Sequence, residues 1–306
     1  MTVRAAVSCW CGSPTGREQF RTPTFRLVRC VRCGCYRIDP PPIARSDEAP
    51  IFYSSYYDRP RHGAGCERWQ NGGDRAPHSE WRSSRFWQVA RKEPSLTTSG
   101  GRVADIGCGE GDLCNELRMA GWQRVIGLDV SCARIARARA RYPDGEFYDR
   151  PIEQTGVAAA SLDLIIMDNV IEHLPEPMEM LRTLRRYLKP EGRIVVITPN
   201  MTSGHFRLLG RRWTPELAPH AHIFLFTPPS MGVLLANAGF KVGRIGSFHL
   251  PIYSPVAWTT RLLSADVKGA VWRGIQELGG IYGRLIGTGP MLYAIAHPSR
   301  SADIAA

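Results

Sequence analysis

The sequence predicts an α/β fold in which a parallel sheet is covered by helices on both faces. Between residues 102 and 198, short apolar runs of strand length alternate with longer segments of helical periodicity. Apolar strands in such an alternation are typical of parallel sheets buried on both sides. Five cysteines within the first 40 residues add a small metal-binding module in front of this domain.

The α/β region divides into elements that follow one another without a break. We expect them in this order: strand 102–106, helix 113–119, strand 124–128, helix 133–141, strand 162–167, helix 178–188 and strand 193–198. A further helix over 227–238 is closed by Gly239, since glycine readily ends a helix. Strands over 240–248 and 291–297 are expected side by side, with an amphipathic helical insertion over about 254–289 between them.

Three regions are expected along the chain. Residues 1–40 form the metal-binding module, which ends in the stiff run Asp39-Pro40-Pro41-Pro42. Residues 41–98 are a linker and helical cap, with a loop or short helix over the tyrosine-rich stretch 51–73 and helical spacing over 78–91. Residues 99–306 are the main domain.

Composition excludes fewer possible functions than the motifs do. The 306 residues are 43% hydrophobic, enough for one large core and a small appendage. The sequence has no secretion signal and no apolar run of membrane-spanning length, so we expect a cytoplasmic protein. The formal charge of +11 is spread along the chain, which favours a solvated basic surface over a dedicated nucleic-acid site.

The most specific motif is the run from Val103 to Gly111, where an apolar strand leads into three alternate glycines and then a helix. Glycines let the backbone approach a ligand closely, and the helix start offers unpaired N–H groups. The next strand ends in Asp129, about 20 residues downstream, where a carboxylate can accept hydrogen bonds from a ribose diol. This order and spacing predict a nucleoside-binding site.

The segment from Asp105 to Gly111 resembles motif I of class I S-adenosylmethionine-dependent methyltransferases, which places an acid before the glycines. Residues 161–166 and 188–193 resemble the family's fourth strand and the turn before its fifth. The resemblance covers roughly residues 100–250 and implies a Rossmann-like, seven-stranded methyltransferase sheet. By this resemblance Asp105 contacts the amino-acid part of the cofactor, and Asp129 holds its ribose. The other implied cofactor residues are Gly107, Gly109, Gly111, Val130, Ile152, Asp168 and Asn169.

The N-terminal cysteines form two knuckles about 20 residues apart, Cys9-Trp10-Cys11 and Cys30-Val31-Arg32-Cys33. Four thiolates close a tetrahedral structural zinc site, and a module of about 40 residues has too little core to fold without one. Because the first knuckle has a single intervening residue, Cys35 is an alternative ligand. The arrangement resembles a bacterial methyltransferase group with an N-terminal zinc ribbon, whose members act on sugars, polysaccharide precursors or secondary metabolites.

Methyl transfer to a hydroxyl or carbon acceptor requires a proton acceptor beside the cofactor. Glu172 and His173 follow the strand over 162–167, on the cofactor side of a doubly wound sheet. His222 lies in a later segment that resembles the family's histidine-containing stretch before Phe-Thr. Either histidine is a candidate base, and Glu172 can orient a histidine or join both of them in a divalent-metal site.

These observations predict a methyltransferase that uses S-adenosylmethionine and modifies oxygen or carbon of a small molecule. An RNA methyltransferase is the alternative enzyme, since zinc ribbons and basic surfaces also suit RNA. Against it, no Asn-Pro-Pro-Tyr-type motif follows the fourth strand. A non-catalytic protein that binds S-adenosylmethionine for a partner is the third reading, and the retained acid, glycines and histidines argue against it.

Overall fold

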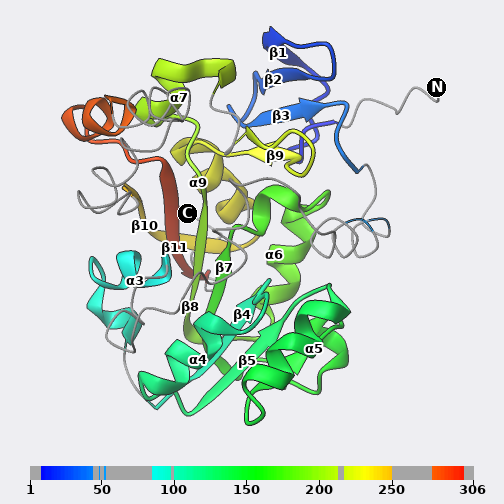
Figure 1. Ribbon diagram of the computed structural model, residues 1–306, viewed down its shortest axis with the longest axis vertical. Coiled ribbons are helices and arrows are strands. Elements are labelled where there is room, and N and C mark those ends of the chain that lie inside the picture. Colours follow the sequence, from blue (N-terminus) through cyan, green and yellow to red (C-terminus); the bar gives the residue numbers. More distant parts are fainter. Residues whose placement is uncertain are drawn as a thin grey trace, which may run out of the picture.

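Figure 1 shows the computed structural model of the chain, in which residues 8–43, 48, 52, 85–97, 100–212, 217–249 and 278–299 are described. The tyrosine-rich stretch 51–73 lies outside the described residues, apart from Phe52. Residues 78–84 of the expected cap helix and 254–277 of the expected insertion lie outside them as well.

The main domain is built on a seven-stranded sheet of mixed direction. In the order in which they lie across the sheet, the strands are β10 (Phe240–Phe248), β11 (Met291–Pro298), β8 (Leu188–Pro199), β7 (Leu162–Asp168), β4 (Arg102–Ile106), β5 (Arg124–Leu128) and β6 (Glu146–Tyr148). The strands from β8 to β6 run parallel, whereas β11 is antiparallel to both β8 and β10. The chain therefore has the seven-stranded, Rossmann-like sheet that the sequence predicts.

Helices connect the parallel strands and cover the sheet. They are α3 (Arg85–Ala90), α4 (Asp112–Met119), α5 (Cys132–Arg141), α6 (Pro177–Arg185), α7 (Gly204–Leu209) and α9 (Pro228–Asn237). Ser131 caps α5 by accepting a hydrogen bond from the backbone of Arg134, and Thr227 forms a capping box with Ser230 at the start of α9. Two large apolar clusters fill the sheet faces, which explains why the strand sequences are continuously apolar.

The expected boundary between helix 178–188 and strand 193–198 is wrong. Helix α6 ends at Arg185, and β8 begins at Leu188, which pairs with Leu162 before the register shifts. Gly192 permits this irregular start, because a Cβ there would lie 2.8 Å from the carbonyl oxygen of Leu162.

The cysteine-rich module forms a second sheet that is completed by a strand from the main domain. Its order is β1 (Gly16–Arg21), β2 (Arg26–Cys30), β3 (Tyr36–Asp39) and β9 (Phe224–Leu225). Strand β9 comes from the segment between β8 and α9, and it pairs with β3 in antiparallel register. Figure 1 shows the module at one end of the molecule, with β9 beside it. The main domain and the module are therefore joined by strand pairing as well as by the chain.

Candidate active site

The expected cofactor site lies at the carboxyl ends of β4, β5 and β7. Gly107 and Gly109 follow β4 with φ of 77° and 58°, a left-handed backbone that favours glycine. At Gly109 a Cβ would have no neighbour nearer than 3.6 Å, a guanidinium nitrogen of Arg134. The backbone there is thus open to a ligand. Gly111 shares the left-handed backbone, with φ of 83°, and a Cβ there would in addition lie 2.7 Å from the ring of Phe147.

Asp129, at the end of β5, is placed by two backbone hydrogen bonds. Its Oδ2 accepts from the N–H of Gly109 at 3.0 Å, and its Oδ1 accepts from the N–H of Ser131 at 2.9 Å. The carboxylate therefore links the glycine loop to the start of α5. Val130 beside it keeps 47% of its surface exposed, although it is a large apolar residue. An acid next to an exposed apolar side chain suits a ribose and an adenine ring.

Asp105 and Asn169 carry polar atoms that are buried without adequate partners. Burial, reinforced by the nearby Asp168 carboxylate, raises the pKa of Asp105 to about 8. Among the described residues its one hydrogen-bond donor is the thiol of Cys114, at 3.7 Å, and no salt bridge involves it. Asn169, with φ of 56°, has a buried Oδ1 that accepts no hydrogen bond. Such acceptors fit the ammonium and amino groups of a bound amino acid or nucleoside.

The remaining expected cofactor residues frame this edge of the sheet. Ile152 is buried at the start of a 3₁₀ turn, Ile152–Gln154, that follows β6. Asp168 ends β7, and its Oδ1 accepts a hydrogen bond from Nε of Arg85 at 2.6 Å. Sequence reasoning missed Arg85, which lies 83 residues earlier on α3. No local pattern pairs the two residues, so only the fold brings this cation to the site.

Glu172, His173 and His222 come together in the interior of the protein. Glu172 and His173 lie in a 3₁₀ turn, Ile171–His173, directly after β7, and His222 lies two residues before β9. Glu172 is fully buried, and the two histidines are less than a tenth exposed. The imidazole rings meet edge to face with centroids 4.7 Å apart. Nε2 of His222 lies 3.9 Å from Oε1 of Glu172.

The electrostatics of the cluster differ from residue to residue. Burial, together with the nearby Asp168 carboxylate, raises the pKa of Glu172 to about 8, against the opposing effect of its backbone N–H and the Thr198 hydroxyl. Thr198 donates to Oε2 of Glu172 at 3.0 Å, whereas Oε1 has no hydrogen-bond partner. Burial lowers the pKa of His173 to about 4, and Nδ1 of His173 lies 3.1 Å from the carbonyl oxygen of Ala221. His173 is therefore neutral at pH 7.

The same three side chains could hold a divalent cation. Their candidate ligand atoms all lie within 4.8 Å of one another, and two imidazoles with one carboxylate are a common ligand set. The cluster thus supports either proton transfer or cation binding at one place, beside the expected cofactor site.

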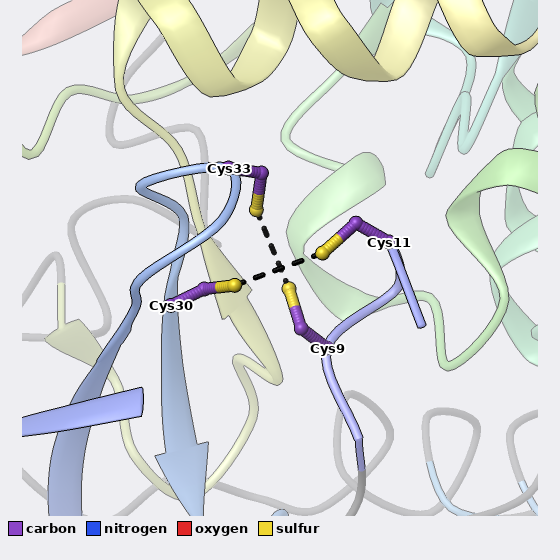
Figure 2. A group of neighbouring side chains, drawn as sticks. All are labelled: Cys9, Cys11, Cys30 and Cys33. Carbon is purple, nitrogen blue, oxygen red and sulfur yellow. Dashed lines mark hydrogen bonds between the residues drawn. The ribbon is translucent and has the colours of Figure 1, made fainter. Parts of the chain in front are cut away.

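Figure 2 shows the four cysteines of the two knuckles with their sulfur atoms directed at a common centre. Cys9 Sγ lies 3.5 Å from Cys33 Sγ, and Cys11 Sγ lies 3.6 Å from Cys30 Sγ. All four sulfurs lie within 4.8 Å of one another. Zinc with four thiolates at about 2.3 Å requires sulfur separations of about 3.8 Å. The cysteine geometry therefore fits tetrahedral zinc.

Cys35 has a different environment from the four clustered cysteines. Its thiol donates to the carbonyl oxygen of Leu225 at 3.3 Å, and this contact joins β3 to β9. At the second knuckle, burial opposes ionisation, but the backbone N–H groups of Cys33 and Arg32 lower the pKa of Cys30 to about 6. These N–H groups favour a thiolate at Cys30.

A family model described as a methyltransferase domain matches residues 81–244. A Mycolicibacterium smegmatis protein named "probable S-adenosylmethionine-dependent methyltransferase" is 34% identical over 155 residues, which are 49% of this chain and 56% of that protein. The chain thus spans little more than half the length of that relative. A ubiquinone biosynthesis O-methyltransferase of Cereibacter sphaeroides is 28% identical over a region that covers 56% of this chain and 72% of that protein.

The fold is also that of a solved methyltransferase. The structure of the 1,6-didemethyltoxoflavin-N1-methyltransferase of Burkholderia thailandensis superimposes with a TM-score of 0.54. The superposition covers 93% of this chain and the whole of that chain, at 14% sequence identity. At this identity the similarity concerns the fold alone.

Proposed function

Because the chain belongs to the family of class I S-adenosylmethionine-dependent methyltransferases, we propose that it methylates oxygen or carbon of a small molecule. The acceptor class is a sugar, a polysaccharide precursor or a secondary metabolite. The observation that carries the proposal is the buried pair of Glu172 and His222 beside the expected cofactor site, 3.9 Å apart. A small-molecule acceptor is supported by the relative named for ubiquinone biosynthesis.

Bound S-adenosylmethionine would supply an electrophilic methyl group, and the chain's own residues would hold and orient the reactants. Asp105 is suited to the amino-acid end of the cofactor, and Asp129 to its ribose. Asn169, with its free buried oxygen, would accept a hydrogen bond from the cofactor. Holding the acceptor in line with the transferred group supplies much of the rate of such a displacement.

His222 is the proposed proton acceptor. Glu172 lies beside Nε2 of His222 and, because its pKa is raised to about 8, is largely protonated at pH 7. It can orient the His222 ring in this form, and once ionised it would stabilise the imidazolium that forms when the acceptor loses its proton. His173, kept neutral by burial, packs against the His222 ring and orients it. Thr198 holds the Glu172 carboxyl group from the opposite side. His222 would thus transfer the proton, and Glu172, His173 and Thr198 would position its ring.

The four clustered cysteines are proposed to hold one structural zinc ion. Four thiolates close the coordination sphere, so no position is left for a water molecule or a substrate. The zinc would hold the two knuckles together, and none of the methyl transfer would pass through it. The described residues contain no helix long and apolar enough to cross a membrane. Action in the cytoplasm remains our proposal.

The function is tested with S-adenosylmethionine that carries a labelled methyl group. Wild-type protein and the Asp129→Ala variant are incubated with a fractionated cell extract, separated into small molecules, RNA and protein. We expect label in the small-molecule fraction with wild-type protein and a strong loss with the variant. Label that enters only RNA would replace the small-molecule proposal. Wild-type protein that binds S-adenosylhomocysteine but labels nothing would point to a non-catalytic binding protein.

A further inference from the structure

Two adjoining helical segments carry an unusual concentration of exposed apolar side chains. Residues 278–285 form a helix that precedes β11, and α7 follows β8. Figure 1 shows α7 and this helix, in orange, next to each other at one end of the molecule. Of the large apolar residues exposed in the described part of the chain, more than half lie on these two segments. They are Leu208, Leu278, Ile281, Tyr282 and Leu285.

The helix over 278–285 is amphipathic, but its large apolar side chains are exposed and its small residues are buried. Its large apolar residues follow the i, i+3, i+4, i+7 spacing that places them on one face, and Leu278 and Leu285 on this face are 59% and 80% exposed. The glycines at 279, 280 and 283 are buried instead. A helix that packed only against its own domain would bury the large side chains and expose the small ones.

The buried glycines explain how the helix is held. A Cβ on Gly204 of α7 would lie 2.5 Å from the backbone of Gly283, and a Cβ on Gly279 would lie 3.0 Å from the ring of His205. The two segments therefore pack backbone to backbone, and the small residues are required by that contact. Leu208, one turn after Gly204 on α7, is a further exposed apolar residue next to this contact.

Within the two described stretches the charged side chains have a single sign, although Glu277 directly precedes the second stretch in the sequence. Residues 204–212 and 278–288 contain four arginines, Arg207, Arg211, Arg212 and Arg284, all of them exposed. Neither stretch contains an aspartate or a glutamate. In these stretches, exposed apolar side chains alternate with arginines and there are no acids. Such a surface is complementary to an anionic lipid bilayer, which has an apolar interior and negatively charged headgroups.

We propose that the face formed by α7 and residues 278–285 binds the surface of an anionic lipid bilayer. The apolar residues would enter the headgroup region, and the arginines would contact the phosphates. Because α7 begins directly after β8, the face lies at the carboxyl edge of the sheet, where the candidate active site also lies. A membrane-bound enzyme would thus have this edge near the bilayer. The inference does not depend on the identity of the methyl acceptor.

The test is flotation of the full chain with two kinds of vesicle, phosphatidylcholine alone and phosphatidylcholine mixed with phosphatidylglycerol. We expect binding to the mixed vesicles that weakens as salt is raised, and much weaker binding to the neutral ones. The double variant Ile281→Gln/Leu285→Gln and the double variant Arg207→Gln/Arg284→Gln should each bind mixed vesicles about tenfold less tightly or worse.

Matched controls come from other surfaces of the same chain. Met119→Gln/Val233→Gln removes two exposed apolar side chains from α4 and α9, and Arg118→Gln/Arg137→Gln removes two arginines from α4 and α5. Both controls should float like the wild type. Calorimetry with S-adenosylhomocysteine on every preparation shows whether the fold and the cofactor site are intact, so failure of the proposed function is seen separately.

Hydrogen exchange gives a second measurement that needs no variant. Mixed vesicles should slow amide exchange in residues 278–288 and leave β4 and β5 unchanged. Wild-type protein that floats with neither vesicle overturns the proposal, and so does flotation that the Ile281→Gln/Leu285→Gln variant leaves unchanged. If sedimentation shows a dimer that this variant dissociates, and vesicles are not bound, the face is a self-association surface and the proposal is wrong.

Discussion

At the scale of single residues, the proposed cofactor site depends on a few carboxyl and amide groups at the carboxyl ends of the strands. Asp129 has two backbone donors and sits at the end of β5, and replacement by alanine removes its acceptor oxygens. We expect Asp129→Ala to weaken S-adenosylhomocysteine binding about 10- to 100-fold, measured by calorimetry. Asp144→Ala, at an exposed carboxylate in the turn before β6, is the control. Unchanged affinity in a folded Asp129→Ala protein would remove this residue from the site.

The two histidines can be separated by kinetics. His222→Ala should lower kcat by a factor of about 10² to 10⁴ and leave S-adenosylhomocysteine binding intact, if His222 accepts the proton. His173, whose pKa is lowered to about 4, is already neutral across the working range. If kcat/KM rises with pH because the base must be neutral, that rise should therefore vanish in His222→Ala and persist in His173→Ala.

If both variants keep full turnover, neither histidine is the base. Proton removal would then belong to Glu172 or to an acceptor bound to a cation at the cluster. Chelator treatment distinguishes these cases where elemental analysis shows that the zinc of the cysteine module is retained, because turnover is then abolished only if a cation at the cluster takes part. A cation held by Glu172, His173 and His222 should be restored by adding the metal back.

At the scale of elements, the zinc module and the histidine segment are one structural unit. The N–H of Ile38 in β3 donates to the carbonyl oxygen of Ile223, and the N–H of Ile223 donates to that of Glu172. The contacts run from the module through β9 to the acidic residue of the cluster. Unfolding of the module should therefore change the position of His222.

We expect one zinc per chain by elemental analysis, and Cys33→Ser should release it. Amide exchange at Ile38 and Ile223 should then rise about tenfold or more, because the shared strand pairing loosens, whereas β4 and β5 stay protected. Cys132→Ser, at an exposed cysteine outside the cluster, should change neither zinc content nor exchange. Protein purified without chelator that contains no zinc would contradict this prediction.

An element can be predicted from the sequence when its own residues carry the pattern that forms it, and cannot when it forms through pairing with a distant segment. Strands β4, β5 and β7 were predictable because their apolar runs are buried by the sheet itself. Strand β6 has only three residues, too few for a pattern, and β9 has two. Strand β9 forms because it pairs with the edge of β3, and no periodicity in its own residues predicts this pairing.

The candidate site divides in the same way. The places of Asp129 and Glu172 were predictable, because a parallel sheet brings residues after its strand ends to one edge, and Asp105 lies within the last two residues of β4 at the same edge. The Arg85 to Asp168 ion pair was not, since it depends on how a preceding helix packs. The exposed apolar face of helix 278–285 was not predictable either, because an amphipathic pattern shows that one face is apolar and leaves open whether that face is buried.

At the scale of the whole molecule, buried ionisable groups make stability depend on pH. Glu172 has a folded pKa of about 8, above the ordinary 4.5, so its contribution is full at low pH and is lost as pH rises towards 8. His173 has a folded pKa of about 4, below the ordinary 6.5, so its contribution is full above pH 6.5 and is lost as pH falls. Of these two residues, only Glu172 makes stability fall between pH 6.5 and 8.

Between pH 6.5 and 8, the unfolding free energy of Glu172→Gln should fall by about 2 kcal/mol less than that of the wild type. This is the value for one proton over 1.5 pH units. Urea unfolding of both proteins at pH 6.5 and pH 8 gives the comparison. Glu179→Gln, at an exposed carboxylate on α6, should behave like the wild type. Parallel pH curves for Glu172→Gln and wild type would show that Glu172 titrates normally.

The strand shared by the two sheets also sets an order of events while the chain is being made. Cys35 and its partner Leu225 are 190 residues apart, so a ribosome that adds roughly 5 to 20 residues per second needs roughly 10 to 40 seconds to supply the missing strand. Until then β3 is an open edge, able to pair with any extended chain nearby. Zinc bound early would hold the knuckles together during this interval, and nascent chains stalled before residue 224 should be the ones most prone to aggregate.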